Sequence, residues 1–467
     1  MTKSLSLLLV VAGALVAAEP SSITEQYREV SQKLIAAALA DQEGLDRLQY
    51  LCDRIGNRLS GSASLERAIE WSAAEMKKAG LENVRTPAVK VPHWVRGRES
   101  ATLLAPIEKR LPMLGLGMSV GTPPEGITAE VVAVSSFDEL TALGRDRVAG
   151  KIVLFNPPWE GYGKTGVYRG AGASKAAALG AVAALVRSMT GNSLATPHTG
   201  MMSYAPDAPR IPAAALTVED AAMIHRLVKA GTPVRVRLQM EAQHLPDATS
   251  HNVMGEIRGR EKPEEVVVLG GHIDSWDVGQ GAQDDGSGII ATFQAVALIR
   301  KLGLQPRRTI RVVFWTNEEN GMHGGKAYRE MLGDDVKNHV AAIEMDGGAE
   351  MPAGFGFGNS GTGRRNVGPA ASPAAFQRAV DIGSLLESLS IGKVTPGGGG
   401  ADISPLLASG VPGFGIQTTG GHYFDWHHTE ADTFDKIVPR EFQLHVAQLA
   451  VLSYVLADMP ERIADIK

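Results

Sequence analysis

A buried strand followed by a glycine-rich polar segment constrains the fold of this chain more than any other feature. Residues 266–269 are an unbroken apolar run, and residues 289–302 are apolar at helical spacing. The segment between them, 270–288, reads GGHIDSWDVGQGAQDDGSG and is predicted to be a loop between a sheet strand and a helix. In an open α/β sheet, ligand sites lie beyond the carboxyl ends of the strands. We therefore expect this loop to belong to a ligand site.

The polar side chains of the loop are those of a metal site. His272 offers an imidazole nitrogen, and Asp284 offers two carboxylate oxygens. Asp274 is placed to hold the second ring nitrogen of His272 and to fix its tautomer. The alternative is a surface turn rich in Asp and Gly, with solvated carboxylates. The loop alone does not decide between the two, because a short motif is weak evidence.

Length and composition describe a globular protein of two domains. A chain of 467 residues exceeds what one hydrophobic core usually supports. Its hydrophobic content of 44% and net charge of -5 are ordinary, and no basic patch favours nucleic acid as a partner. Cys52 is the single cysteine, so any metal must use histidine and carboxylate ligands.

The first 20 residues have the features of a secretory signal. Lys3 provides the charged start, residues 5–16 the apolar core, and residues 16–18 the small-residue cleavage site. The core is too short to span a bilayer as a helix, although an uncleaved anchor is the alternative. We expect cleavage after Ala18, no stable membrane insertion, and a secreted or periplasmic protein.

The predicted secondary structure changes character twice along the chain, which indicates an inserted domain. Residues 21–80 are helical in pattern, and residues 251–458 alternate strands and helices as in a mostly parallel sheet flanked by helices. Between them, short strands and many Gly and Pro residues predict a β-rich insert with two helices, at 173–186 and 218–230. The predicted division is a signal peptide at 1–18, a mixed α/β catalytic domain at 19–98 plus 240–467, and an insert at 99–239.

Three further polar groups follow predicted strands. Glu318 and Glu319 come just after the apolar strand 311–315, Asp346 follows another strand, and residues 421–429 hold three histidines. Each has an ordinary interpretation: an acidic helix start for the glutamates, a turn for the aspartate, and structural roles for the histidines. Together they change the interpretation, because parallel strands end at one edge of a sheet.

We expect this edge to hold two zinc ions, since zinc takes nitrogen and oxygen ligands and needs no cysteine. The predicted ligands are His272, Asp284, Glu319, Asp346 and His428. Spacing alone does not distinguish His428 from His422 or His427, and His428 is chosen because Thr429 follows it. Two Zn²⁺ ions balance three carboxylates and a hydroxide. Glu318 is the predicted general base, and zinc would lower the pKa of water to about 7.

The residue set HxD…DD…EE…D…H[ST] resembles the co-catalytic di-zinc exopeptidases, a family that includes bacterial aminopeptidases and glutamate carboxypeptidases. The resemblance is strongest to the plasma glutamate carboxypeptidase branch, and it covers nearly the whole chain, with 99–239 similar to a protease-associated insert. It implies that His272 and Asp346 bind one zinc, that Glu319 and His428 bind the other, and that Asp284 bridges them.

The resemblance also implies that Glu318 is the base, that Asp274 orients His272, that the Asp284–Asp285 peptide is cis, and that the protein is a homodimer. One position departs from the family: several relatives have tyrosine where this chain has His427. His427 could donate a hydrogen bond to the oxyanion, Tyr423 could reach in instead, or zinc alone could polarise the carbonyl. We favour His427.

The predicted reaction is hydrolysis of dipeptides or short peptides at a chain end. The carboxypeptidase or dipeptidase reading is favoured, and an aminopeptidase is the alternative. The glycine-rich loops at 396–401 and 418–421 are the predicted substrate-reading segments, with a purely flexible hinge as the alternative for 397–400. A receptor-like protein without catalysis and a one-zinc glutaminyl-cyclase-like enzyme are further alternatives, and zinc stoichiometry discriminates between them.

Overall fold

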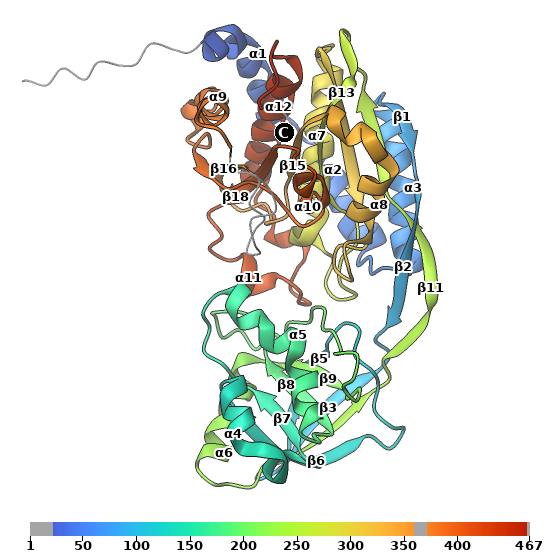
Figure 1. Cartoon of the computed structure of the whole chain (residues 1–467), viewed down its shortest axis with the longest axis vertical. Helices are drawn as coiled ribbons and strands as arrows, with labels where there is room; N and C mark the ends of the chain where they lie inside the picture. Colours follow the sequence, from blue (N-terminus) through green and yellow to red (C-terminus); the bar gives the residue numbers. More distant parts are fainter. Residues whose placement is uncertain (1–21, 359–370, 465–467) are drawn as a thin grey trace, which may run out of the picture.

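The computed structural model describes residues 22–358 and 371–464, which form two lobes (Figure 1). The predicted signal peptide at 1–18 lies outside the described residues. Within the described ranges, no helix is both long and apolar enough to cross a membrane.

The larger lobe is built on an eight-stranded mixed sheet with its four parallel strands in the middle. Strands β14, β13, β15 and β18 are neighbours, and each adjacent pair is parallel. The carboxyl ends of these strands therefore lie at one edge, as predicted. The strand order is β1 (Glu82–Arg85), β12 (Val253–Ile257), β14 (Arg308–Trp315), β13 (Lys262–His272), β15 (His339–Glu344), β18 (Gly413–Thr418), β16 (Pro352–Gly358) and β17 (Val394–Pro396).

Both faces of this sheet are covered by helices. Strand β13 shows this, because its successive residues pack into cores on opposite faces. Val267 and Leu269 join the main core, whereas Val266 and Val268 join the core on the opposite face. The main core also takes residues of α1 (Ser22–Leu39), α2 (Glu43–Tyr50), α3 (Ala63–Lys78), α7 (Ser287–Lys301), α9 (Pro373–Ser384) and α12 (Pro439–Asp458). The opposite core takes residues of α8 (His323–Leu332) and α10 (Ser404–Ala408).

Short helical turns complete the larger lobe. They are η1 (Leu51–Ile55), η2 (Ala282–Gly286), η3 (Gly333–Asn338), η4 (Glu387–Leu389), α11 (Tyr423–Trp426) and η5 (Phe434–Lys436). Of these, η2 contains the predicted ligand Asp284, and α11 ends two residues before the predicted ligand His428.

The smaller lobe holds a second eight-stranded sheet and its own two cores. Its strand order is β4 (Lys109–Leu111), β3 (Glu99–Ala105), β10 (Arg235–Met240), β6 (Ile127–Val134), β7 (Ile152–Phe155), β8 (Ala183–Arg187), β9 (Ala213–Leu216) and β5 (Met113–Gly115). Its helices are α4 (Phe137–Val148), α5 (Tyr162–Ala178) and α6 (Val218–Lys229).

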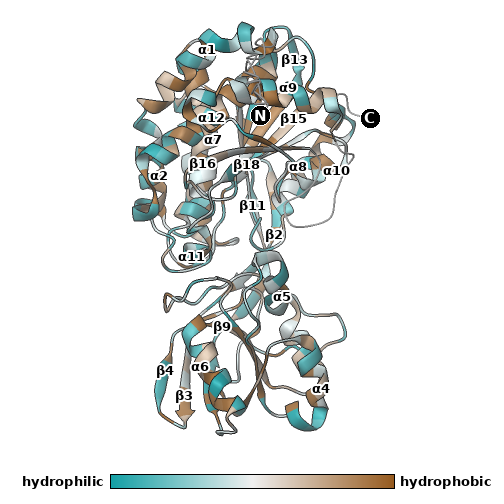
Figure 2. Ribbon diagram, turned by 90° about the vertical axis from the view of Figure 1, so that its left-hand side faces the viewer, coloured by the Kyte–Doolittle hydropathy of each residue, from teal (hydrophilic) through white to brown (hydrophobic). Residues whose placement is uncertain are grey.

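The two lobes lie end to end, joined by a two-stranded antiparallel ribbon of β2 (Ala88–Val95) and β11 (Gln243–His251). The orthogonal view shows the same arrangement, with the ribbon running down to the junction (Figure 2). At the junction, α11 of the larger lobe faces α5 of the smaller one, and Tyr162 stacks on Phe424 at 5.2 Å between ring centroids.

One predicted element is wrong: residues 173–186 are not a single helix. Helix α5 starts earlier and ends at Ala178, and Ala183–Arg187 is the strand β8, with all five residues buried. A short, wholly buried strand shows no alternation of polar and apolar residues, so its sequence cannot be told from a buried helix. The sequence prediction also omitted α4, whose start is capped by the Ser136 hydroxyl accepting from the Glu139 amide.

Candidate metal centre

The predicted ligands come from the carboxyl ends of the four parallel strands and from the start of α7. His272 is the last residue of β13, and Glu319 follows β14. Asp346 follows β15, and His428 lies beyond β18, just after α11. Asp284 lies in η2, the turn that leads into α7.

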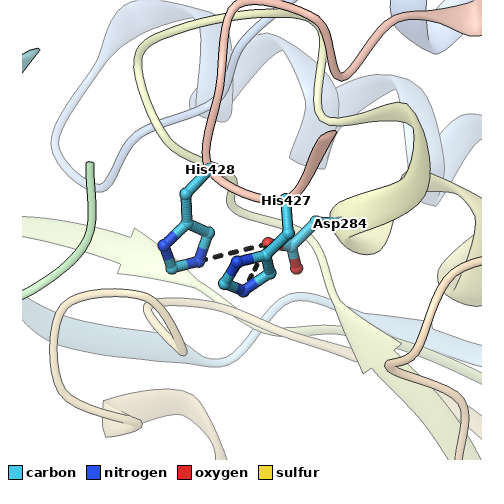
Figure 3. A group of neighbouring side chains, drawn as sticks. All are labelled: Asp284, His427 and His428. Carbon is cyan, nitrogen blue, oxygen red and sulfur yellow. Dashed lines mark ion pairs between the residues drawn. The ribbon is translucent and has the colours of Figure 1, made fainter. Parts of the chain in front are cut away.

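Asp284 lies at the centre of the group, between His272 and His428. Figure 3 shows Asp284 facing the adjacent rings of His427 and His428. Its Oδ1 is 3.2 Å from His272 Nε2, and its Oδ2 is 3.2 Å from His428 Nε2. His272 Nε2 is also 3.5 Å from Asp346 Oδ1, and His428 Nε2 is 3.0 Å from Glu319 Oε2. The two oxygens of one carboxylate therefore face two separate pairs of potential ligands.

In the structure, His427 also lies beside Asp284, next to the ligands that were predicted from the sequence. His427 Nε2 is 3.5 Å from Asp284 Oδ2, and its ring stacks on that of His428 with centroids 3.5 Å apart. Two sets of potential ligand atoms lie within 4.8 Å of one another: Asp284 with His427 and His428, and His272 with Asp284 and Asp346. Glu319 belongs to neither set but keeps its contact with His428.

Two buried polar residues, Asp432 and Arg58, stabilise the loop that carries Asp284 by hydrogen bonds to its backbone. Asp432 accepts hydrogen bonds from the amides of residues 282, 283 and 284, at 3.1, 2.7 and 3.2 Å. Arg58 is fully buried and donates to the carbonyls of Gly56, Ile273 and residues 280 and 281. The Asp284–Asp285 peptide is cis, which confirms that prediction.

Asp274 orients the site by a different atom than the sequence suggested. His272 Nδ1 lies 2.9 Å from the backbone carbonyl of Asp274, whereas the Asp274 carboxylate is 3.9 Å away. That carboxylate instead accepts the backbone amides of Glu318 at 3.0 Å and Glu319 at 3.3 Å. Residue 274 thus fixes the His272 tautomer with its carbonyl and fixes the glutamate pair with its side chain.

Burial and mutual repulsion shift the pKa values of the carboxyl groups upward. Burial raises the pKa of Glu318 well above its usual value, and the nearby carboxylates of Asp346 and Glu319 raise it further. Burial also raises the pKa of Asp346 and Glu319. A cation beside these groups would favour their ionised forms.

The histidines oppose this effect at Asp284. Although burial acts to raise the pKa of Asp284, His427, His272 and His428 hold it well below the usual range. Burial acts to lower the pKa of His272, but Asp284 and Asp346 outweigh it and raise the value well above normal. Asp284 is therefore the most strongly ionised carboxylate of the group.

The donor set fits divalent zinc, since imidazole nitrogens and carboxylate oxygens are its common ligands. Within the described parts of the chain, no hydrogen-bond donor reaches the buried Glu319 Oε1. A buried carboxylate oxygen without a donor is costly unless a cation neutralises it. Asp346 is the most exposed predicted ligand, with 23% of its side chain accessible, so the group opens to solvent on that side.

Tyr423 and His427 both lie beside the ligand group, so the structure leaves both available to the oxyanion. Their rings are 5.1 Å apart, and His427 Nδ1 is buried without a hydrogen-bond partner among the described residues. Burial raises the pKa of Tyr423 well above its usual value, and the charge of Asp284 adds to the shift. The Tyr423 phenol therefore stays protonated and able to donate.

The sequence analysis missed residues of the smaller lobe that reach this site. It found no convincing acid and histidine arrangement in 99–239, yet Tyr162 packs edge-on against His427 at 5.0 Å, and Thr199 bonds to His428. Thr199 contacts His428 only through its backbone amide and carbonyl, and every residue except proline carries both groups. No sequence signal could have found Thr199. Asp432, four residues beyond His428, could have been considered as a further acid near the ligand motif.

Comparison with known proteins agrees with this geometry. Residues 252–453 match peptidase family M28. The chain is 42% identical to carboxypeptidase Q of Bos taurus over 438 residues, which cover 93% of this chain and 90% of that protein. The similarity thus extends over both lobes.

Solved structures give the same result. A peptidase M28 precursor from Shewanella amazonensis SB2B superposes with a TM-score of 0.88 at 32% identity, covering 95% of this chain and 99% of the other. A zinc aminopeptidase from Bacillus subtilis shares the fold with a TM-score of 0.65 at 18% identity, over 91% of this chain and 97% of the other.

Proposed function

Because this chain belongs to peptidase family M28, we propose that it is a secreted di-zinc exopeptidase that hydrolyses dipeptides or short peptides. Its similarity to carboxypeptidase Q, predicted from the sequence, supports the exopeptidase class. One observation carries the two-metal form of the proposal: Asp284 directs Oδ1 toward His272 and Oδ2 toward His428, each at 3.2 Å. A carboxylate with one oxygen toward each pair is suited to bridge two ions.

In this proposal, His272 and Asp346 would hold one zinc ion, His428 and Glu319 would hold the other, and Asp284 would serve both. The contacts of 3.5 Å between His272 and Asp346 and of 3.0 Å between His428 and Glu319 support these pairings. When bound, zinc would lower the pKa of water toward about 7 and polarise the scissile carbonyl.

Glu318 acts as general base and then as general acid. It takes a proton from the attacking water as the new bond to the carbonyl carbon forms. When the C–N bond breaks, Glu318 gives that proton to the departing amine nitrogen, and the second proton of the water stays on the new carboxyl group, so a free amine and a carboxylic acid leave. Asp274 keeps Glu318 in place through its amide, at 3.0 Å.

His427 is the proposed donor to the oxyanion, with Tyr423 as the second choice. His427 Nε2 already faces Asp284 Oδ2 at 3.5 Å, so its ring is at the reacting side of the group. A donor aimed at developing negative charge is worth about 3 kcal/mol in related hydrolytic sites.

The remaining parts of the proposal follow from the sequence. An N-terminal signal peptide at 1–18 would direct export, residues 99–239 would form a protease-associated domain, and the protein would be a homodimer. The loops 396–401 and 418–421 would contact the substrate backbone.

The test is a dipeptide panel combined with zinc analysis of the purified, metal-replete protein. The panel contains free dipeptides, N-acetylated dipeptides and C-amidated dipeptides with the same side chains. We expect close to two zinc ions per chain and hydrolysis of the free dipeptides. Loss of activity on amidation alone indicates a carboxypeptidase, loss on acetylation alone an aminopeptidase, and loss on both a dipeptidase. Zinc near one per chain, or no hydrolysis of any peptide, contradicts the proposal.

A further inference from the structure

Thr199 of the smaller lobe makes two direct hydrogen bonds to His428 itself. The Thr199 amide donates to the His428 carbonyl at 3.0 Å, and His428 Nδ1 lies 3.3 Å from the Thr199 carbonyl. A carbonyl oxygen can only accept, so Nδ1 must carry the proton. The other ring nitrogen, Nε2, is then unprotonated and free to bind a metal.

His428 needs such support because its backbone is in an unfavourable conformation. Its φ of 64° lies in the left-handed region, which residues other than glycine rarely adopt. Such a conformation persists only where neighbouring contacts hold it. The paired bonds to Thr199 hold both the backbone and the ring of His428.

Two buried arginines hold Thr199 in turn. Arg169 of α5 donates from Nη1 to the Thr199 carbonyl at 3.2 Å, the same oxygen that faces His428. Arg96 donates from Nη2 to the Thr199 hydroxyl at 3.3 Å and also binds Asp277, in the loop after β13, at 2.6 Å. Arg169 is only 9% exposed, and its Nη2 also donates to the Tyr162 hydroxyl at 2.5 Å.

We propose that Arg169 is a positioning residue for the zinc ligand His428, acting through the carbonyl of Thr199. The inference rests on the proposed function, because it gives His428 a metal to bind. In this proposal, two residues of the smaller lobe, Arg169 and Thr199, position a metal ligand of the larger lobe. Partners of a metal-binding histidine fix its tautomer and ring orientation, and their loss typically costs about 10- to 100-fold in metal affinity.

The test measures zinc affinity, ion by ion, by competition with a chromophoric chelator. Arg169→Met removes the guanidinium, and Arg169→Lys restores a donor without the planar fork. Gly200→Ala perturbs the same point from the other side, because a Cβ at Gly200 would lie 2.4 Å from Arg169 Nη1. Gly166→Ala is its matched control in α5, since a Cβ at Gly166 would meet nothing within 4 Å.

We expect Arg169→Met and Gly200→Ala to bind one zinc ion as the wild type does and the second about 10- to 100-fold more weakly. Arg169→Lys should recover part of the loss, and Gly166→Ala should match the wild type. If Gly200→Ala does not fold, the Arg169 pair decides. Wild-type affinity for both ions in Arg169→Met overturns the inference. A wild-type chain that takes up fewer than two ions refutes the proposed function itself, and the inference with it.

Discussion

At the scale of single residues, Asp284 differs from the other predicted ligands because it faces both histidines. Asp346 faces only His272, at 3.5 Å. Asp284→Ala should therefore remove a ligand from two ions, whereas Asp346→Ala should remove a ligand from one. We expect dialysed Asp284→Ala to retain almost no zinc and Asp346→Ala to retain about one ion per chain, measured by elemental analysis. Equal zinc content in the two variants contradicts a bridging Asp284.

Substitution of Glu318 should have the opposite effect: the variant should lose catalytic activity but still bind zinc. Glu318→Gln preserves the size of the side chain and the backbone bond to Asp274, but it cannot take up a proton. We expect kcat to fall by about 10²- to 10⁴-fold with zinc content unchanged. Full activity in this variant would remove Glu318 from the mechanism.

The sequence identified side chains at strand ends but not the backbone groups that orient them. His272, Asp284, Glu319, Asp346 and His428 all stand where the alternation of strands and helices placed them. The carbonyls of Asp274 and Thr199 could not be predicted, because a carbonyl has no residue-specific signature and its direction depends on the local fold. The prediction of a carboxylate partner for His272 chose the right residue and the wrong atom.

At the scale of elements, the turn η2 depends on Asp432 more than on its own sequence. Three consecutive amides donate to this one carboxylate, and burial raises the pKa of Asp432 to about 7. Asp432→Ala leaves those amides without an acceptor. We expect a loss of about 3 kcal/mol in unfolding free energy and a weaker affinity for zinc.

Asp435→Ala is the matched control for that substitution. Asp435 lies in the same segment, but 71% of its side chain is exposed, and it pairs with Lys436. Exposed ion pairs contribute little, so its unfolding free energy should stay within about 1 kcal/mol of the wild type. Chemical denaturation of the two variants side by side makes the comparison, and equal losses would contradict the role of Asp432.

The elements themselves were predictable to different degrees for a physical reason. Helices with one buried face, such as α3, and strands with flanking turns were found from periodicity. Ala183–Arg187 was taken for part of a helix because every residue is buried on both sides of the sheet. The four apolar residues 183–186 show no period, and pairing with the neighbours β7 and β9 is what makes this segment a strand.

At the scale of the whole molecule, the sequence predicted two parts but not how they meet. Composition marks the change near residue 99, whereas the junction is made by separated residues. Asn192 of the smaller lobe donates to Asp425 of the larger one at 2.6 Å, and the Thr199 amide donates to the His428 carbonyl at 3.0 Å. Such pairs have no sequence pattern, since they depend on how two completed lobes come together. The candidate metal centre is thus built from larger-lobe residues and lies against the smaller lobe, which contacts it through Tyr162 and Thr199.

Global stability should depend on pH through histidines that the fold keeps neutral. His339, at the start of β15, is 1% exposed, and burial lowers its pKa to about 3. Its ordinary value is about 6.5, so in mild acid the unfolded chain binds a proton that the folded chain does not. The stability contributed by neutral His339 is therefore present above pH 6.5 and is lost progressively as the pH falls toward 3.

A comparison of wild type with His339→Gln isolates this effect. Glutamine cannot be protonated in this range, so only the wild type should lose the linked term. With a chelator present in both samples, so that metal release does not contribute, we measure unfolding free energies by denaturant at pH 7.5 and pH 5. The wild type should lose about 2 kcal/mol relative to the variant across that interval. A difference that does not change with pH would mean that His339 accepts a proton in the folded protein, for instance by releasing the Tyr328 hydroxyl, which lies 2.8 Å from its Nε2.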